Sequence, residues 1–478
     1  MTIRTFIAAN AKFGLFGAAL LLSACGTQYT HYKERRADEA YQQAVAANDL
    51  IGQRNALLLL TNADEDVSDY WIRLAKVELE LGSYAGAYQH FSRAHELDRT
   101  DVPSLSMMTE LAVINGRLDL ADTHLKELLV LAPNDRAVAV ARGFEALRSG
   151  NFDQAESNAQ ILLSQSANDS IGNVLQTRIL VTQKKIPEAI SLLEQKLAAT
   201  PDDRAMLRSL AAVYRYLGQW PKAVPLALKL WKLSPRDPKT AAQAISDSLH
   251  AGDHPAALEI TRRVLADAKD KDELDNVLSA WAKLTPGDGS LAAAIPASAS
   301  DMTRIAFAHY LNQVGRPNQA LNVLGRKSRP LGVRANVPFN AAFAEALEVR
   351  GQLQPARQML DRILVKEGDN EVALGARARL QSAMGDHRRA TIDAQRLVAN
   401  YSTNPDYRLL LAKVYRASHD GRSAERTLWD GFRDLPVAES LYNEVRHILV
   451  ARGDAEGVSR LDSGYQDDRF AQLLKELA

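Results

Sequence analysis

Residues 70–98 read YWIRLAKVELELGSYAGAYQHFSRAHELD. Apolar residues recur at intervals of three and four on both sides of Gly82, so each half predicts an amphipathic helix. The glycine marks the turn between them, because a left-handed backbone conformation costs little only at glycine. Five residues later the small side chain of Ala87 allows the second helix to approach the first closely. The stretch therefore predicts an antiparallel pair of helices.

The same pattern recurs with a period of 34 residues. The turn glycines follow one another at steps of 34, 34, 68 and 34 residues: Gly82, Gly116, Gly150, Gly218 and Gly252. The position missing from the long step is held by Lys184. A small residue follows each turn, always at a step of 34: Ala87, Ala121, Ala155, Ala189, Ala223 and Ala257. Prolines, which cannot continue a helix, close three of the second helices at Pro133, Pro201 and Pro235. A fixed period of this length predicts a stacked repeat array.

Beyond Gly252 the register breaks, and the next turn with its alanine is found at Gly315 and Ala320. The segment between them, residues 283–301, is rich in Gly, Pro, Ala and Ser and predicts a loop or a degenerate repeat. The pattern resumes with the pairs Gly351/Ala356, Gly385/Ala390, His419/Ala424 and Gly453/Val458. A basic stretch, residues 325–338, accounts for the longer step before them.

The 34-residue pattern resembles the tetratricopeptide repeat, whose marks are Trp or Leu, Gly, Tyr, Ala, Phe and Ala at set positions. Residues 70–98 supply them as Trp71, Gly82, Tyr84, Ala87, Phe91 and Ala94. The resemblance implies an all-α fold, an α-solenoid of antiparallel helix pairs, and the break in register predicts two lobes. It extends over about residues 69–462, with one interruption.

The only cysteine of the 478 residues lies near the start of the chain. Arg4 and Lys12 precede an apolar run of about ten residues, which is too short to span a bilayer but has the layout of a secretory signal. The run ends in Leu22-Ser23-Ala24-Cys25, which resembles the lipobox of bacterial lipoproteins. The resemblance implies cleavage between Ala24 and Cys25 and lipidation of Cys25. A buried N-terminal helix is the alternative interpretation.

The predicted organisation is a signal peptide (1–24), a lipidated cysteine with a tether (25–36), an atypical helical pair (37–67), a first lobe (68–271), a degenerate repeat or linker (272–300), a second lobe (301–464) and a capping helix (465–478). Gly26 stands where an Asp would resemble a signal for retention in the inner membrane. We therefore expect the outer membrane, on its periplasmic face.

Composition and motifs argue against several classes of function. Lys plus Arg and Asp plus Glu both number 58, so the basic footprint of a nucleic-acid binder is absent. The sequence has no P-loop, GxGxxG, HExxH or CxxC motif. His250 and His254 could in principle share a metal ion, but they flank a turn. We expect no cofactor, no metal and no catalytic residue; a closed pocket with clustered titratable groups would reverse that expectation.

The resemblance implies that the first helices line a concave groove that binds protein segments. With the turn residue counted as position fifteen, positions two, five, nine, twelve and thirteen face it. The candidate partner-binding residues are Phe144, Leu147, Arg148, Val174, Arg178, Arg208, Arg215, Tyr216, His309, Arg379, Lys413 and Arg416. Arginine can hold a carboxylate through two parallel hydrogen bonds. These cations could equally be ordinary solvated residues.

The expected function is a scaffold or assembly factor for an envelope system such as a pilus, a secretion machine or polysaccharide export. The alternative is a regulator of a cell-wall or polysaccharide enzyme that acts through protein contacts. The sequence does not indicate an oligomeric state or a partner.

Overall fold

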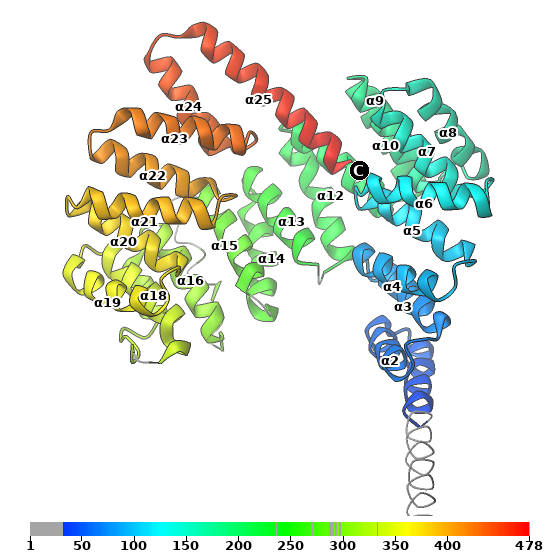
Figure 1. Cartoon of the computed structure of the whole chain (residues 1–478), viewed down its shortest axis with the longest axis horizontal. Coiled ribbons are helices and arrows are strands. Elements are labelled where there is room, and N and C mark those ends of the chain that lie inside the picture. Colours follow the sequence, from blue (N-terminus) through cyan, green and yellow to red (C-terminus); the bar gives the residue numbers. More distant parts are fainter. Residues whose placement is uncertain are drawn as a thin grey trace, which may run out of the picture. The chain divides into compact units, whose positions relative to one another are not determined.

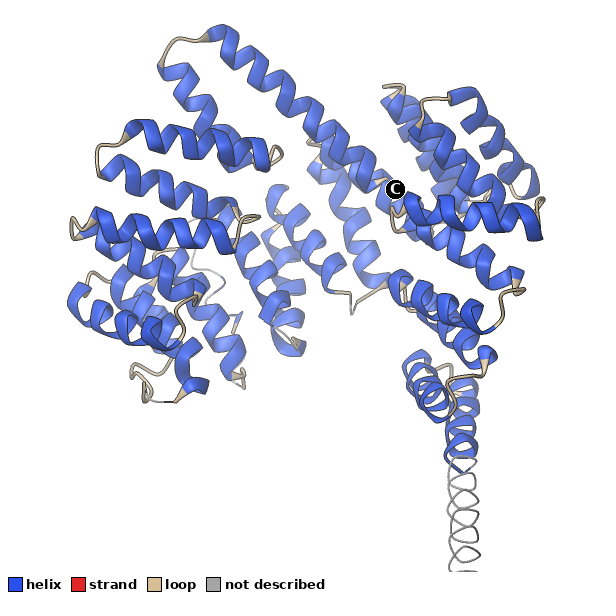
Figure 2. Cartoon of the chain, in the orientation of Figure 1, coloured by secondary structure: helices blue, strands red, loops and turns tan. Residues whose placement is uncertain are grey.

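The computed structural model describes residues 32–235, 237–268, 271–285, 291, 294–295, 298–331 and 333–477. All regular structure in these ranges is helical, and no strand occurs in them (Figure 2). This confirms the all-α solenoid. The signal peptide, Ala24 and Cys25 lie outside the described residues, so their predicted roles stay predictions.

The chain divides into two compact units with the border between Met206 and Leu207. In unit 1, a helix over residues 32–46 precedes nine labelled helices (Figure 1). These are α2 (Leu50–Ala63), α3 (Ser68–Glu80), α4 (Tyr84–Leu97), α5 (Val102–Ile114), α6 (Leu118–Leu131), α7 (Arg136–Arg148), α8 (Phe152–Gln165), α9 (Ser170–Thr182) and α10 (Ile186–Ala199). The border falls in the first turn of α11 (Arg204–Tyr216).

Unit 2 continues with α12 (Trp220–Leu233), α13 (Pro238–His250), α14 (His254–Asp267), α15 (Lys271–Leu284), α16 (Asp301–Gln313), α17 (Pro317–Val323), the short η2 (Arg334–Asn336) and α18 (Val337–Val349). The remaining helices are α19 (Leu353–Lys366), α20 (Glu371–Ala383), α21 (His387–Asn400), α22 (Pro405–Ala417), α23 (Gly421–Asp434), α24 (Glu439–Ala451) and α25 (Ala455–Glu476).

The turns lie where the 34-residue grid places them. Every glycine of the grid has a positive φ, for example 80° at Gly82 and 76° at Gly150. Lys184 and His419, which replace glycine in two repeats, adopt the same left-handed conformation, with φ of 60° and 61°. The backbone at these two positions is thus set by the repeat, against the preference of the residue.

The small residues after the turns pack the two helices of each repeat together. Ala87, Ala155, Ala189, Ala223 and Ala257 are all fully buried. A larger side chain at any of these positions would force the paired helices apart, because protein interiors contain little free volume. The repeat spacing and the helix contacts therefore agree, and the fold is the stack of antiparallel helix pairs that the resemblance implies.

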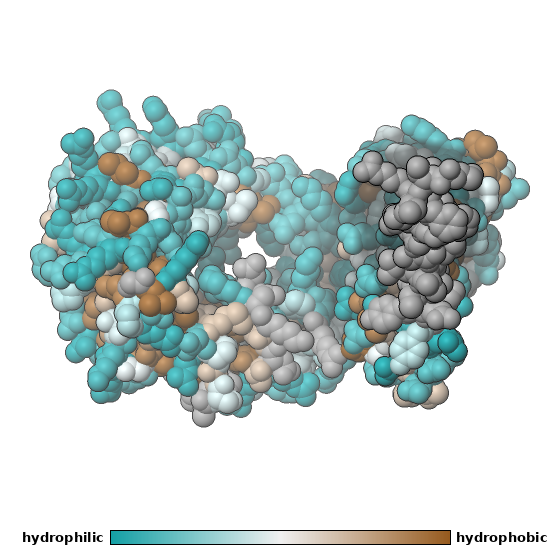
Figure 3. Space-filling view, turned by 60° about the horizontal axis from the view of Figure 1, so that its bottom comes forward, coloured by the Kyte–Doolittle hydropathy of each residue, from teal (hydrophilic) through white to brown (hydrophobic). Residues whose placement is uncertain are grey.

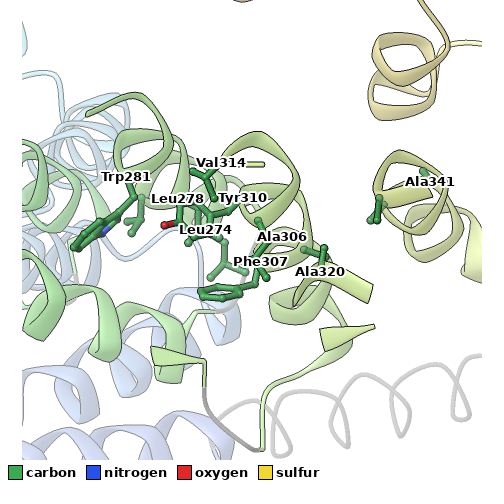
Figure 4. Packing of buried hydrophobic residues seen from close by; sticks show 14 of the residues in the cluster. Leu274, Leu278, Trp281, Ala306, Phe307, Tyr310, Val314, Ala320 and Ala341 are labelled. Atoms are coloured by element: carbon green, nitrogen blue, oxygen red, sulfur yellow. The ribbon is translucent and has the colours of Figure 1, made fainter. Parts of the chain in front are cut away.

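The first part of the segment predicted as a degenerate repeat or linker is a packed helix. Leu274, Val277, Leu278 and Trp281 lie on one side of α15 and are almost completely buried. Figure 4 shows Leu274, Leu278 and Trp281 beside Phe307 and Tyr310 of α16. The indole Nε1 of Trp281 donates to Thr261 Oγ1 of α14 at 2.8 Å. One core therefore continues through this region, and the border between compact units lies about 65 residues earlier than the predicted linker.

The second helix of the last predicted repeat and the capping helix form one continuous helix. α25 has 22 residues and passes through Gly464 without a break. No neighbouring group lies within 4 Å of the position that a side chain at Gly464 would occupy. Its first part packs through Leu461 against Leu441 and Val445 of α24, which leaves the second part free to contact another part of unit 2.

Among the helices that the structure describes, none combines the length and the apolar character needed to cross a bilayer. On the face drawn in Figure 3 the surface is largely hydrophilic, and apolar residues form small separate patches.

Candidate functional site

The first helices of successive repeats contact one another within each unit. In unit 1, α5 contacts α7 and α7 contacts α9; in unit 2, α16, α18, α20, α22 and α24 form a similar succession. Successive second helices do not approach each other this closely in the described residues. In a curved array of helix pairs, the helices that lie closer to their counterparts in the next repeat are on the inner side. The first helices therefore form the concave side of each unit. We call this side the first-helix face.

In unit 1 the structure brings Arg178 of α9 and Phe144 of α7 together. The Arg178 guanidinium lies over the Phe144 ring, 5.0 Å from its centroid. Its Nε and Nη1 atoms are buried and have no hydrogen-bond partner. Burial, with no opposing carboxylate, lowers the pKa of Arg178 to about 10. The side chain therefore stays charged at neutral pH without a counter-ion.

The surroundings of this pair are apolar. Phe144, Leu147 and Val174 are each at most 8% exposed and belong to one cluster. Arg148, at the exposed end of α7, is already paired with Asp122 of α6 at 2.6 Å. Of the five candidate residues in unit 1, three thus belong to one apolar cluster, Arg178 lies over a member of it, and Arg148 is engaged elsewhere.

In unit 2 two of the candidate residues hold the chain's own C-terminal helix. Arg215 Nη2 contacts Glu476 Oε2 of α25 at 3.0 Å, and its Nη1 lies 3.3 Å from the buried Asp247. Tyr216 packs edge-on against Phe470, with ring centroids 5.8 Å apart. The carbonyl oxygen of Tyr216 accepts a hydrogen bond from Arg469 at 3.0 Å. The half-buried Arg208, one to two turns earlier on α11, takes no part in these contacts.

A second group of candidates forms a buried charge network on α16, α18 and α20. Glu345 Oε2 of α18 lies 2.6 Å from His309 Nδ1 and accepts a hydrogen bond from Asn312 Nδ2 at 3.0 Å. Its other oxygen lies 3.0 Å from Arg379 Nη2, which also contacts Glu348 at 3.1 Å. We call these five residues the Glu345 network.

The contacts within the network shift the pKa values of Glu345 and His309 in opposite directions. Burial would raise the pKa of Glu345, but the charges and hydrogen bonds of His309 and Arg379 outweigh it and lower the pKa to about 2. Burial would lower the pKa of His309, yet the Glu345 carboxylate outweighs it and raises the pKa. The Glu345 carboxylate is therefore charged at neutral pH, and the raised pKa favours the charged form of His309. These charges are compensated within the network, which is a structural rather than a ligand-binding arrangement.

The remaining candidates of unit 2 are exposed. Lys413 is solvent-exposed on α22, and Arg416 on the same helix pairs with Glu444 of α24 at 2.7 Å. Sequence reasoning identified the cations of this face but missed their partners Glu345, Glu348 and Glu444. The signal for Glu345 was available: His309, Glu345, Arg379 and Lys413 occupy position nine in consecutive repeats.

The two histidines considered for a metal site face different side chains. The His250 ring stacks on Trp220 with 4.1 Å between centroids, and His254 lies edge-on to Trp281 at 6.0 Å. Within the described residues, no group of three or more His, Cys, Asp or Glu side chains could hold a metal ion.

Comparison with protein-family models and with curated proteins gave no match. Comparison with solved structures matched two tetratricopeptide proteins and a pilus biogenesis factor, among others. The P58(IPK) tetratricopeptide domain is 15% identical, with 81% of this chain and 98% of that chain covered and a TM-score of 0.24. PilW, a type IV pilus biogenesis factor, is 19% identical over 44% and 98%, with a TM-score of 0.31. A tetratricopeptide repeat protein of Parabacteroides merdae is 13% identical over 58% and 98%, with a TM-score of 0.30.

Proposed function

We propose that this protein is a protein-binding scaffold of the bacterial envelope, held at the periplasmic face of the outer membrane by a lipid on Cys25. It would serve the assembly of an envelope system, namely a pilus, a secretion machine or a polysaccharide exporter. The tether after Cys25 would keep the repeat array close to the membrane and raise the effective concentration of its binding face there.

The observation that carries the binding function is the docking of α25 on the first-helix face of unit 2. A helical segment is held there by an arginine–carboxylate pair and an aromatic contact, Arg215 with Glu476 and Tyr216 with Phe470. The same face of unit 1 carries the pair Arg178 and Phe144 in an apolar surround. This favours protein segments as ligands.

The binding function is tested by photo-cross-linking in the native host. A photo-reactive residue replaces Arg148, which is exposed on the first-helix side of unit 1. The matched control replaces Val130, which is 82% exposed on the second helix α6. We expect adducts with structural components of an envelope machine from position 148 and few from position 130.

Two other outcomes would change the assignment. Adducts with a murein or polysaccharide enzyme would favour the regulator instead of the scaffold. Equal yields at both positions would contradict a binding role for the first-helix face.

The anchor is tested separately with the substitution Cys25→Ser. Two or more acyl chains give stable membrane attachment, since each buried methylene contributes about 0.8 kcal/mol. Loss of the thiol should therefore leave the protein uncleaved or release it from the membrane fraction. A cleaved form that stays in the membrane would contradict lipidation.

A further inference from the structure

We propose that Arg178 and Phe144 form the binding site for a carboxylate side chain carried by an amphipathic helical segment of a protein partner. The proposal rests on the proposed binding function and specifies its ligand. It names the chemistry that a partner needs on this face: an Asp or Glu beside an aromatic or aliphatic side chain.

The first argument is the unpaired charge. Two other half-buried arginines of the described residues have carboxylate partners: Arg136 contacts Glu110 and Asp169, and Arg377 contacts Asp361 and Asp393. Arg178 has buried Nε and Nη1 atoms with no acceptor. A buried charge without a partner is unfavourable in the folded state. A ligand carboxylate would supply the missing acceptors, and arginine presents two parallel donors for it.

The second argument is the apolar surface beside the charge. The Phe144 ring, 3% exposed, lies under the guanidinium, and Val174 one turn before Arg178 is 8% exposed. The ring face offers partial compensation to the cation but no hydrogen bond. A ligand that pairs with Arg178 must therefore place apolar atoms next to its carboxylate, as an amphipathic helix does.

The third argument is that in unit 2 the same two residue types, an arginine and an aromatic residue, hold a helical segment. Arg215 and Tyr216 are also an arginine and an aromatic residue on the first-helix face. There α25 supplies Glu476 to the arginine and Phe470 to the aromatic ring. Arg215 has the additional carboxylate Asp247, whereas no carboxylate of the described residues acts on Arg178. The site in unit 1 thus lacks the acidic group that its counterpart in unit 2 has.

The test is a selection of short helical peptides from a displayed library on the full-length protein. We expect the selected peptides to share an Asp or Glu close to a Phe or Leu. Their affinity should fall roughly tenfold or more with Arg178→Gln, because a hydrogen-bonded charge pair is lost. Replacing the peptide carboxylate by its amide should cause the same fall on the wild type and none on the variant. Arg142→Gln, an exposed arginine on α7 outside the candidate positions, is the matched control and should bind as the wild type does.

Thermal unfolding provides a readout that does not depend on the ligand. Arg178→Met removes an unpaired buried charge, so its midpoint should equal or exceed that of the wild type. Arg136→Met removes a paired one and should unfold at a lower temperature. A lower midpoint for Arg178→Met would assign Arg178 a structural role and overturn the proposal.

The outcomes separate this proposal from the proposed function. Peptides without a shared acid, or peptides that bind Arg178→Gln unchanged, would overturn the carboxylate site and leave the scaffold function standing. A library that yields no binding peptide would contradict both the carboxylate site and the scaffold function.

Discussion

The Glu345 network gives the sharpest quantitative prediction. Glu345 is 6% exposed and contacts His309, Asn312 and Arg379. Its pKa falls from the usual value of 4.5 to about 2 in the folded protein. With about 1.4 kcal/mol per unit of pKa, the charged form of Glu345 contributes on the order of 3 kcal/mol to stability at neutral pH. Breaking a buried ion pair costs a similar ~3–5 kcal/mol.

The perturbation is Glu345→Gln, with Glu444→Gln as the matched control. Glu444 also pairs with an arginine, Arg416 of the preceding repeat, but the side chains of Glu444 and Arg416 are 38% and 46% exposed. Exposed pairs contribute only about 0–1 kcal/mol. The free energy of unfolding should therefore fall by about 3 kcal/mol in Glu345→Gln and by less than about 1 kcal/mol in Glu444→Gln.

The assay is urea unfolding followed by tryptophan fluorescence. Four of the five tryptophans, Trp220, Trp231, Trp281 and Trp429, lie in unit 2, so the signal reports mainly on the unit that contains the network. Circular dichroism follows both units together. Equal losses in Glu345→Gln and Glu444→Gln would refute the assignment of a large stabilisation to the buried network.

The contributions of Glu345 and His309 to stability change with pH in opposite directions. The lowered pKa of Glu345 means that its contribution is present above pH 4.5 and is lost as the pH falls towards 2. The raised pKa of His309 means that its contribution is present below pH 6.5 and is lost as the pH rises through the folded value. Asp275 and Lys271 of α15 also act on His309, in opposite directions.

The stability of unit 2 should therefore be greatest between about pH 4.5 and 6.5. His309→Gln should remove the decline on the alkaline side. An alkaline decline that persists unchanged in His309→Gln would assign it to another group.

Three further predictions concern local packing. Lys184→Gly should raise the free energy of unfolding by about 1 kcal/mol, since glycine adopts the left-handed conformation of this position without the strain that lysine has there. Chemical denaturation of the variant measures the change, and a loss of stability would contradict the turn assignment. Ala189→Leu should lower the free energy of unfolding by about 1–3 kcal/mol or more, because Ala189 is fully buried between paired helices; an unchanged denaturation midpoint would contradict that close packing. Phe470→Ala should lower the free energy of unfolding by about 1 kcal/mol, because the ring contact with Tyr216 is lost. Amide hydrogen exchange in α11 should become faster, and protection equal to that of the wild type would contradict the docking of α25.

The repeat spacing predicted the turns because one backbone position per repeat must be left-handed. The strongest case is Lys184, where the residue argues against the conformation and only the period of 34 predicts it. The close packing of paired helices could be predicted from the alanines that follow each turn, because one small residue per repeat must lie between the two helices. These features are local and are repeated in every pair, so each repeat supports the prediction of the others.

The partners of the candidate residues depend on contacts between repeats. Arg379 and Glu345 are 34 residues apart, so comparison of equal positions in neighbouring repeats could have found this pair. The contacts of Tyr216 with Arg469 and of Arg215 with Glu476 join residues 253 and 261 positions apart. They depend on the accumulated curvature of all the repeats of unit 2, which no local pattern encodes. The unpaired state of Arg178 likewise becomes visible only when every neighbouring helix is placed.

The docking of α25 on α11 also limits how unit 2 can evolve. An open repeat array can gain or lose a repeat at modest cost, because each repeat interacts only with its neighbours. In unit 2 the last helix must reach Arg215 and Tyr216 at the start. One inserted or deleted helix pair would rotate and shift the end of the array and carry Glu476 and Phe470 away from these residues. The copy number in unit 2 is therefore fixed by geometry, and variation in length between descendants of this protein should be confined to unit 1.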